Sequence, residues 1–434
     1  MRILFVTAHM GGGAGKAIAG MCNYAYKAGN EVTLLALEET KNRKYVEKLS
    51  EDITYIVAEE EQQIRDLHAE ADVVVLNWWA HPLTFSYLLC IQDIPVRIVL
   101  WVHMNGCVYP AISSNFVLCF HQILFTCYYS YDNRSFQDTF DEIKGKSGVI
   151  YGIGEFEPRT MTPKKDYREK QAYVVGYLGT VDYNKMHKDF VQICEKIIEA
   201  TENTLIVIYG ECSETVQSDI ENSKYKDKFV LKGFSDNVEE SFREMDVLLY
   251  PLNPNTSGTT ENVILEAMSC GVPIVALEQG TEKYIIQNEK TGILAKNAAE
   301  LPGEAILLLL NEEKRRQIGR SAREYVLEEY SGCGNAERFL DVIAKVLLVE
   351  KTTIDFASVV GNNPYEWFVS VCGEYDETVR EFIDGGELYS LVQCKDIIGN
   401  RTKSSVRHFY HYYKDAKLLK ICKALWRDEY VKDS

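Results

Sequence analysis

The chain has 434 residues, of which 46% are hydrophobic and 26% are charged, a composition typical of a soluble globular protein rather than a disordered one. At roughly 150 residues per domain, this length predicts two or three domains. Asp and Glu (64) outnumber Lys and Arg (47), so the net charge is −17 at pH 7. Such a surface repels phosphate backbones, and we expect no nucleic-acid partner.

Targeting and metal-binding motifs are not readable in the sequence. The start is apolar only over residues 3–6, too short for the core of a secretory signal, and no run reaches the roughly 18 apolar residues of a membrane helix. The twelve cysteines form no Cys-x-x-Cys pair, so neither a zinc site nor a redox motif is indicated. We therefore expect a cytoplasmic protein with reduced cysteines.

Short apolar runs alternate with helical stretches in the first part of the chain. Residues 3–7 predict a buried strand, 11–13 a glycine turn and 14–27 a helix. Runs rich in Val and Ile are typical of parallel strands covered on both faces, and three more follow, at 31–36, 72–76 and 97–103. Alternating strands and helices predict right-handed crossovers and a doubly wound sheet.

The same alternation begins again after a polar stretch, residues 157–170, which we interpret as an interdomain linker. Beyond it, helices are expected between the strands, for example at 189–200 and 261–270. The strands are predicted at 173–178, 205–209, 229–231, 247–250 and 273–276. The chain therefore contains two α/β halves of similar size.

From about Ile354 the pattern changes to aromatic and charged residues at helical spacing, which predicts a separate helical appendage. Its end, residues 401–434, carries nine Lys or Arg and four acids. A helix over 414–427 would gather apolar residues on one side and basic residues on the other. This pattern suits an anionic membrane surface; alternatively, the apolar stripe packs on the protein and the lysines are solvated.

Glycines 11–13 follow the first predicted strand and open a helix. Glycine allows the backbone to approach a ligand, and free amides at a helix start attract phosphate. The turn is neither a Walker loop nor a clean Gly-x-Gly-x-x-Gly motif. A purely structural tight turn is the alternative.

The most specific stretch, residues 257–276, reads Ser-Gly-Thr-Thr-Glu-Asn-Val-Ile-Leu-Glu-Ala-Met-Ser-Cys-Gly-Val-Pro-Ile-Val-Ala. It runs from a loop into a helix, a glycine stop and a strand. Glu261 is expected in the first helical turn, where the helix dipole favours a carboxylate. Glu266 lies further along the helix, and by itself it is equally well a solvated acid.

This string resembles the retaining glycosyltransferases of family four. Supporting motifs occur in family order over residues 1–347, about 80% of the chain: 11–13, 102–103, 149–154, 176–180 with Lys185, 229–234, 245–251, 291–294 and 322–325. The resemblance implies an α/β GT-B fold, in which two Rossmann-like doubly wound domains face across a cleft. Here a C-terminal helical extension follows them.

Four parts of the chain follow from this resemblance. We expect an acceptor-side domain over residues 1–160 and a nucleotide-sugar-binding domain over 161–330. A closing helix, 331–350, returns to the first domain, and the helical extension with its basic tail covers 351–434.

The resemblance also implies roles for individual residues. Lys185 would neutralise the donor diphosphate, Glu266 would accept hydrogen bonds from the ribose hydroxyls, as acids do in dinucleotide sites, and His103 would line the acceptor side. His103, Glu261 and Lys185 are the predicted catalytic residues; a solvated lysine and a structural histidine are the plainer alternatives. The donor would also be bound by Gly12, Gly13, Gly179, Thr180, Thr260, Asn262 and Val263.

Two positions depart from the family pattern. The glutamate usually found eight residues before Glu266 is Gly258 here, and the arginine usually found directly after the glycine matching Gly179 is Thr180. The missing Glu commonly holds a donor-sugar hydroxyl, and the missing Arg helps to hold the diphosphate. Glu261 is a candidate to replace the missing Glu by reaching back from the helix start.

The sequence contains no Asp-x-Asp motif, so carboxylate-bound Mg²⁺ or Mn²⁺ is not indicated and we expect neither metal nor cofactor. Lys185, backbone amides and a helix dipole would stabilise the leaving diphosphate instead. No carboxylate pair suggests a double-displacement nucleophile. For a retaining transfer, the family implies substitution on one face, with the leaving phosphate deprotonating the incoming hydroxyl.

The sequence thus predicts a cytoplasmic, metal-independent retaining glycosyltransferase that uses a UDP- or GDP-linked sugar. Its acceptor would be a glycan or a lipid-linked saccharide in surface polysaccharide or glycoconjugate biosynthesis. Residues 414–427 would allow peripheral contact with the inner face of the cell membrane. The alternatives are an inactive glycosyltransferase-like scaffold subunit and a sugar-nucleotide epimerase, for which no set of catalytic acids is readable.

Overall fold

The computed structural model describes residues 1–164, 172–399 and 404–426. The chain divides into two compact units: the first contains Met1–Glu155 together with Asn335–Ser434, and the second contains Phe156–Gly334. The chain crosses between them at 155/156 and 334/335, within five residues of the predicted limits of the second domain at 160/161 and 330/331.

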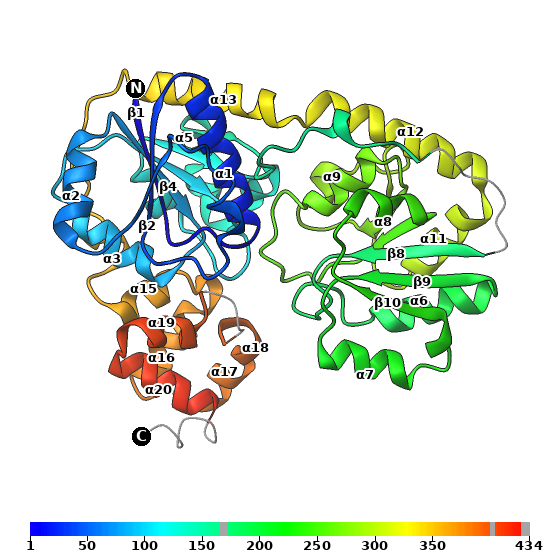
Figure 1. Cartoon of the computed structure of the whole chain (residues 1–434). Coiled ribbons are helices and arrows are strands. Elements are labelled where there is room, and N and C mark those ends of the chain that lie inside the picture. Colours follow the sequence, from blue (N-terminus) through cyan, green and yellow to red (C-terminus); the bar gives the residue numbers. More distant parts are fainter. Residues whose placement is uncertain (165–171, 400–403, 427–434) are drawn as a thin grey trace. The chain divides into compact units, whose positions relative to one another are not determined.

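The first unit is built on seven parallel strands in the order β3-β2-β1-β4-β5-β6-β7 (Figure 1). These are β1 Arg2–Thr7, β2 Glu31–Ala36, β3 Thr54–Val57, β4 Val73–Trp78, β5 Ile98–Val102, β6 Gln122–Phe125 and β7 Ser147–Val149. The order reverses between β1 and β4. In doubly wound sheets, ligands bind beyond the carboxyl ends of the strands at such a point.

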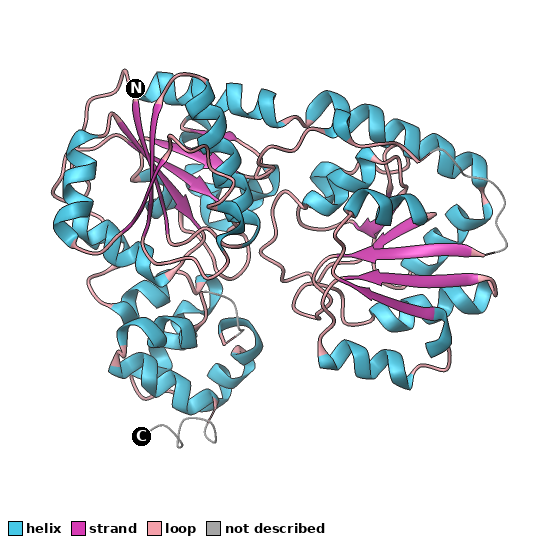
Figure 2. Ribbon diagram, viewed as in Figure 1, coloured by secondary structure: helices cyan, strands magenta, loops and turns pink. Residues whose placement is uncertain are grey.

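Both faces of this sheet are covered, because successive residues of a strand point to opposite sides. Ile3 and Phe5 enter one core and Leu4 and Val6 the other, and all four are at most 2% exposed. This double burial explains the apolar runs in the sequence. The connecting helices are α1 Gly12–Lys27, α2 Glu61–Glu70, α3 Pro82–Ile91, α4 Ser114–Leu118 and α5 Phe140–Gly145 (Figure 2).

The C-terminal extension is helical, as predicted, but it is not separate. Phe85 of α3 lies 6.1 Å from Trp367 and 5.5 Å from Phe409, measured between ring centroids. The extension therefore completes one of the two cores of the first unit. Its helices are α14 Ala357–Val360, α15 Pro364–Ser370, α16 Asp376–Ile383, α17 Leu388–Gln393, α18 Lys395–Ile398, α19 Val406–Tyr413 and α20 Ala416–Leu425, and α13 Gly332–Val346 leads into them.

The apolar side of α20 packs on the protein. Leu418, Ile421 and Cys422 are fully buried, and Leu425 is 6% exposed. At about 1.5–3 kcal/mol per buried side chain, withdrawing all four would forfeit roughly 6–12 kcal/mol, so this face is not free to enter a bilayer. The lysines of α20 remain exposed, and Arg427 lies outside the described residues. Within the described residues, no helix is both long and apolar enough to cross a membrane.

The second unit repeats the architecture with six parallel strands in the order β10-β9-β8-β11-β12-β13. They are β8 Tyr173–Leu178, β9 Thr204–Tyr209, β10 Phe229–Gly233, β11 Val247–Tyr250, β12 Ile274–Leu277 and β13 Ile293–Ala295. Its helices are α6 Phe190–Ala200, α7 Glu214–Asn222, α8 Val238–Glu244, α9 Asn262–Ser269, α10 Glu282–Ile285, α11 Leu301–Leu310 and α12 Glu312–Glu329. The order reverses between β8 and β11.

The predicted linker is structured where it is described. Lys164 is 7% exposed, and its Nζ atom lies 3.1 Å from Oδ1 of Asp246 and donates to the carbonyl of Met245. This buried ion pair fastens the segment to the second unit. The rest of the predicted linker, residues 165–170, lies outside the described residues.

Candidate functional site

Glu261 directly precedes α9, so the expectation that it lies in the first helical turn is wrong by one residue. Its backbone is left-handed, with φ 43° and ψ 66°, a conformation that is strained for a side chain larger than Asn or Asp. The conformation turns the side chain towards the sheet, where it is 5% exposed. Strain of this kind occurs preferentially at functional sites.

The Glu261 carboxylate is held by two side chains from neighbouring strand ends. Nζ of Lys185, from the loop after β8, lies 2.8 Å from each carboxylate oxygen. The hydroxyl of Tyr250, the last residue of β11, donates to Oε2 over 3.0 Å. These contacts form at the β8–β11 reversal, the point where doubly wound sheets bind ligands.

Two stacked tyrosines support this arrangement. The rings of Tyr250 and Tyr177 lie 5.6 Å apart, and Tyr177 donates to the carbonyl of Thr180 over 2.9 Å. Burial, reinforced by the charge of Glu261, raises the pKa of both phenols. Both hydroxyls therefore stay protonated at neutral pH, and Tyr250 is a permanent donor to Glu261.

Gly258 lies beside the Glu261 carboxylate. A Cβ atom at position 258 would lie 2.0 Å from Oε1 of Glu261 and 3.3 Å from Nζ of Lys185. The Glu261 carboxylate thus occupies the space that a side chain at position 258 would enter. Gly258 and Glu261 are complementary at this point.

Glu282, the first residue of α10, is a buried acid that the sequence analysis missed. It is 1% exposed, and its Oε1 atom has no hydrogen-bond partner among the described residues. Burial, together with the nearby Glu261 charge, raises its pKa to about 8, so the carboxyl is protonated at neutral pH. Its polar sequence neighbours give no signal of this burial.

The other predicted donor residues, except Gly12 and Gly13, also lie in the second unit. Gly179 follows β8 with φ +141°, and Thr180 next to it is exposed. Thr260 is 4% exposed, and Asn262 and Val263 are the first two residues of α9, both half-buried. The half-buried Glu266 lies about one turn further along α9.

In the first unit, His103 directly follows β5. Its Nε2 atom lies 2.9 Å from Oδ1 of Asn77, and Nδ2 of Asn77 donates to the carbonyl of Val6 over 3.0 Å. The second bond fixes the orientation of the amide, so Nε2 of His103 carries the hydrogen and Nδ1 keeps a lone pair. Burial lowers the pKa of the imidazole to about 3. At neutral pH His103 is therefore a hydrogen-bond acceptor and not an acid.

Gly12 and Gly13 begin α1 after β1. Gly12 has φ +64°, which favours glycine, and a Cβ atom at either position would meet nothing within 4 Å. The backbone here is open to an approaching group, and the first amides of a helix attract anions. This geometry is compatible with the predicted phosphate contact.

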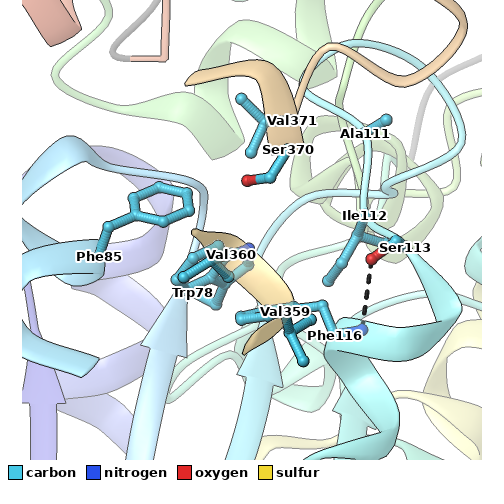
Figure 3. Close-up of a pocket in the computed structure, with 10 residues that line it drawn as sticks. All are labelled: Trp78, Phe85, Ala111, Ile112, Ser113, Phe116, Val359, Val360, Ser370 and Val371. Atoms are coloured by element: carbon cyan, nitrogen blue, oxygen red, sulfur yellow. Dashed lines mark hydrogen bonds between the residues drawn. The ribbon is translucent and has the colours of Figure 1, made fainter. Parts of the chain in front are cut away.

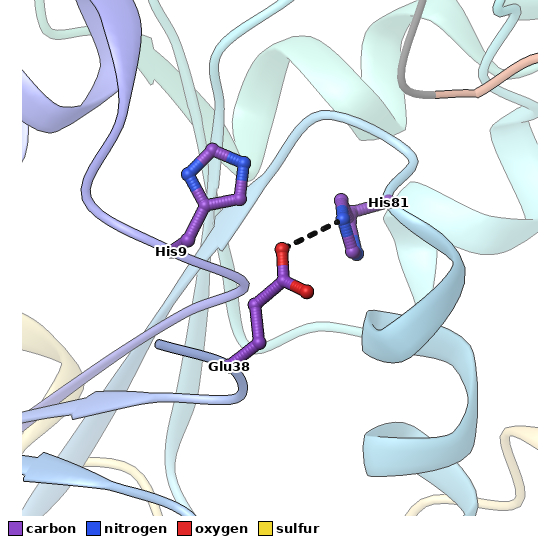
Figure 4. A group of neighbouring side chains, drawn as sticks. All are labelled: His9, Glu38 and His81. Atoms are coloured by element: carbon purple, nitrogen blue, oxygen red, sulfur yellow. Dashed lines mark ion pairs between the residues drawn. The ribbon is translucent and has the colours of Figure 1, made fainter. Parts of the chain in front are cut away.

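Among the described residues, His9, Glu38 and His81 are the group that could supply three metal ligands, with ligand atoms within 4.8 Å of one another (Figure 4). However, Nδ1 of His9 accepts from the amide of Gly11 over 2.9 Å, and Nδ1 of His81 accepts from that of Leu83 over 3.3 Å. Each neutral ring therefore carries its hydrogen on Nε2, whereas metal-bound histidines donate through the second nitrogen. The arrangement does not fit a metal site.

The three residues fit a hydrogen-bond network centred on the carboxylate. Nε2 of His81 lies 3.5 Å from Oε1 of Glu38, and the Tyr412 hydroxyl of α19 donates to Oε2. Burial opposes ionisation of Glu38, but these two partners outweigh it and lower the pKa to about 2. Glu38 is therefore ionised at neutral pH.

An apolar pocket in the first unit lies where the sheet meets the extension, and it is lined by Trp78, Phe85 and Phe116 together with Val360 and Val371 of the extension (Figure 3). Its volume is about 10 Å³, room for no more than one water molecule. It is a packing gap in the shared core and is too small for a substrate.

Part of the second unit matches a known protein family. Residues 172–312 match the family model for group 1 glycosyl transferases. The chain is 32% identical over 178 residues to the N-acetyl-alpha-D-glucosaminyl L-malate synthase of Bacillus anthracis, which covers 40% of this chain and 46% of that one. It is 23% identical over 199 residues to the poly(ribitol-phosphate) alpha-N-acetylglucosaminyltransferase of Staphylococcus aureus. This match covers 44% of this chain and 39% of that protein. The chain thus spans less than half the length of these relatives.

Solved structures agree on the fold of both units. A glycosyltransferase from Rickettsia africae superposes with a TM-score of 0.64 at 17% identity, over 80% of this chain and 98% of its own. The Anabaena protein HepE, solved in complex with UDP and glucose, superposes with a TM-score of 0.62 at 13% identity. The superposition covers 80% of this chain and 100% of HepE. With its two parallel Rossmann-like sheets and these structural matches, the chain has the GT-B fold, and its second unit contains a group 1 glycosyl transferase domain.

Proposed function

We propose that the chain is a retaining glycosyltransferase that moves a sugar from a nucleotide-diphospho-sugar to an acceptor hydroxyl in the synthesis of a glycan or cell-surface polysaccharide. The observation that carries the proposal is the Lys185–Glu261 pair at the start of α9, inside the matched domain. The named activities of the two bacterial relatives, both transfers of N-acetylglucosamine, support the reaction class.

Lys185 is the proposed partner of the leaving diphosphate. In the ligand-free chain its charge is held by Glu261, and its side chain is still 26% exposed. A diphosphate carries more negative charge than one carboxylate and competes for the same ammonium group. The amides of Asn262 and Val263 and the α9 dipole add to this stabilisation.

Glu261 is the proposed ligand for a hydroxyl of the donor sugar, in place of the absent glutamate at position 258. Its carboxylate occupies the space next to Gly258, and the Tyr250 hydroxyl keeps it oriented when Lys185 turns towards phosphate. Glu266, further along α9, is proposed to bind the ribose hydroxyls.

Retention follows, in this proposal, from attack on the face that the diphosphate leaves. The leaving phosphate takes the proton of the incoming hydroxyl, so no residue of the chain has to act as a base. Neutral His103 accepts a hydrogen bond at Nδ1 and orients a substrate hydroxyl. Because its pKa is about 3, it keeps this role throughout the physiological range.

A loose contact with an anionic membrane is proposed only through the exposed lysines of α20. Each basic residue near such a surface contributes about 1 kcal/mol. Two of the three are also engaged within the protein: Nζ of Lys417 lies 4.5 Å from the Tyr365 ring, and Nζ of Lys420 donates to the carbonyl of Ile383 over 3.0 Å. This contact would suit a lipid-linked acceptor on the cytoplasmic side.

A thermal-shift screen against UDP, GDP, ADP and CDP tests the donor site. We expect UDP or GDP to raise the melting temperature, since HepE was solved with UDP, and a ligand at 100 times its Kd stabilises a fold by about 2.7 kcal/mol. Glu266→Ala should abolish the shift, whereas Glu214→Ala, an exposed acid at the start of α7, should not. A chain that binds none of the four nucleotides would contradict the proposal.

A further inference from the structure

The carboxyl edge of the first sheet carries polar and aromatic side chains besides His103. His9 follows β1, Glu38 follows β2, and Trp79 and His81 follow β4. Because these strands are parallel and adjacent, their carboxyl ends meet at one edge. Residues far apart in the sequence therefore form one cluster, and none of them belongs to the donor site.

The indole of Trp79 is half-buried and is held on two sides by imidazoles. The ring of His9 lies 5.5 Å away at 63°, and that of His103 lies 6.2 Å away at 72°, measured between centroids. The Trp79 carbonyl also accepts from Oγ of Ser404 over 3.2 Å. The result is a fixed aromatic surface in contact with His103. The negative face of an aromatic ring attracts the C–H groups of a sugar ring.

The Glu38 carboxylate lies between the His9 and His81 rings and points towards His81 (Figure 4). Its side chain is 30% exposed. A carboxylate has about four lone-pair positions, and among the described residues His81 and Tyr412 approach Glu38, with His9 as a third neighbour. Capacity therefore remains for hydroxyl donors from a ligand. Glu38 and Trp79 both neighbour the His9 ring, and a carboxylate near an aromatic ring is a combination that binds both the hydroxyls and the apolar face of a saccharide.

We propose that Glu38 and Trp79 form a saccharide subsite for a neutral, hydroxyl-rich acceptor, and that the C-terminal extension helps to build it through Tyr412. The inference rests on the proposed function, because it names the chemical class of the acceptor. Ionised Glu38 repels carboxylates and phosphates, so an anionic acceptor such as malate does not fit this subsite. This separates the chain from the relative that is named for L-malate.

Direct binding to the full chain tests the subsite. The probes are p-nitrophenyl glycosides of glucose, galactose and N-acetylglucosamine, with L-malate and glycerol 3-phosphate as anionic counterparts. Saturation-transfer NMR measures the binding of each probe. We expect at least one glycoside to bind. Glu38→Gln and Trp79→Ala should each raise its Kd at least tenfold. Trp79→Phe keeps an aromatic face and should lose less.

Glu39→Gln is the matched control, since Glu39 is the next residue, is 57% exposed and pairs with Arg43; it should leave the Kd within twofold. Equal binding by Glu38→Gln, Trp79→Ala and Glu39→Gln would overturn the proposal, as would binding of the anionic probes alone or of no probe. If Glu38→Gln does not fold, the Trp79 variants decide.

Nucleotide binding, measured on the same samples, separates the two proposals. Binding of UDP or GDP without glycoside binding contradicts the subsite and leaves the glycosyltransferase proposal intact. Glycoside binding that depends on Glu38, without nucleotide binding, supports the subsite and contradicts the glycosyltransferase proposal. We expect every variant to retain its nucleotide affinity, because none of the altered residues belongs to the proposed donor site.

Discussion

The carboxylate of Glu261 fills the space beside Gly258: a Cβ atom on Gly258 would lie 2.0 Å from Oε1 of Glu261. The Glu261 carboxylate therefore occupies space that a side chain at position 258 would need, so a larger residue at 258 requires Glu261 to move or to be replaced by a smaller residue. The relationship links a departure from the family pattern to an unusual left-handed residue at a helix start. Substituting both positions, singly and together, tests this relationship.

Gly258→Glu should destabilise the fold by about 1–3 kcal/mol, as overpacking does. Adding Glu261→Gly should remove the clash and also suit the left-handed backbone at 261, so the double variant is expected to recover much of the loss. Denaturant unfolding of both single variants and the double variant gives the coupling energy. Additive effects would mean that the two positions do not share one space.

Glu261→Gln tests the sugar-binding role without removing bulk. We expect the variant to bind UDP at least as tightly as the unaltered chain does, because the carboxylate that competes for Lys185 is gone, but to lose most of the extra affinity conferred by the sugar of the cognate UDP-sugar. Calorimetric titration with both ligands measures the difference. Lys185→Met should instead weaken both ligands, because it removes the charge that meets the diphosphate. A Glu261→Gln variant that prefers the UDP-sugar over UDP as strongly as the unaltered chain does would contradict the sugar-binding role of Glu261.

Much of the fold could be predicted from sequence, because strands covered on both faces produce apolar runs such as that of β1. The strands missed were short or partly exposed: β3 (Thr-Tyr-Ile-Val) is half-buried, and β7 (Ser-Gly-Val) has three residues. An amphipathic pattern indicates that one face of a helix is buried but not what covers it, so the sequence of α20 is compatible both with a membrane surface and with packing on the protein.

The candidate site could be predicted only where its residues lie in short local motifs, such as Lys185 after β8 and Glu261 before α9. The stretch before and along α9 identified Glu261 and Glu266, but its left-handed start depends on the loop around it. The Glu38 network brings together residues 9, 38, 81 and 412, and no local pattern connects positions so far apart. Glu282 shows the same limit, since its burial is a tertiary property.

Leu418→Ala should lower the free energy of unfolding by about 2–5 kcal/mol, as large-to-small changes in cores do, because Leu418 is fully buried in the core shared by the sheet and the extension. Lys423→Gln on the exposed side of α20 should have an effect within about 0.5 kcal/mol. Chemical denaturation measures both. A mild effect of Leu418→Ala would indicate that the extension is not part of this core.

The charges on α20 can be tested separately from its apolar side. Replacing Lys417, Lys420 and Lys423 together by Gln should reduce co-sedimentation with vesicles that contain anionic lipid and should not change binding to neutral vesicles. Each lysine contributes about 1 kcal/mol at most, so the effect should disappear in high salt. Vesicle binding that survives both salt and the triple substitution would contradict an electrostatic contact.

Asn77→Asp tests the protonation state of His103. A carboxylate next to Nε2 favours the imidazolium form, which places a hydrogen on Nδ1 and ends its role as an acceptor. Transfer by the variant should fall as the pH drops below the raised pKa, while the unaltered chain, with a His103 pKa of about 3, shows no such loss between pH 5 and 8. Proton NMR of the His103 ring follows the titration directly. A pH profile of transfer that the substitution leaves unchanged would argue against the acceptor role.

Glu282 makes stability depend on pH in the opposite direction from most carboxylates. The folded chain keeps its proton up to about pH 8, whereas the unfolded chain releases it near pH 4. Between these values the folded state binds more protons, so this contribution to stability is complete below about pH 4 and declines as the pH rises, by about 1 kcal/mol per unit.

Glu282→Gln keeps a neutral side chain of the same size and removes the decline. We expect the variant to match the unaltered chain at pH 5 and to unfold at a higher temperature at pH 8, with Glu278→Gln, an exposed acid nearby, as the control. Parallel curves for Glu282→Gln and the unaltered chain across this range would mean that Glu282 is ionised in the folded protein, and the Lys185–Glu261 site would then contain two buried negative charges instead of one.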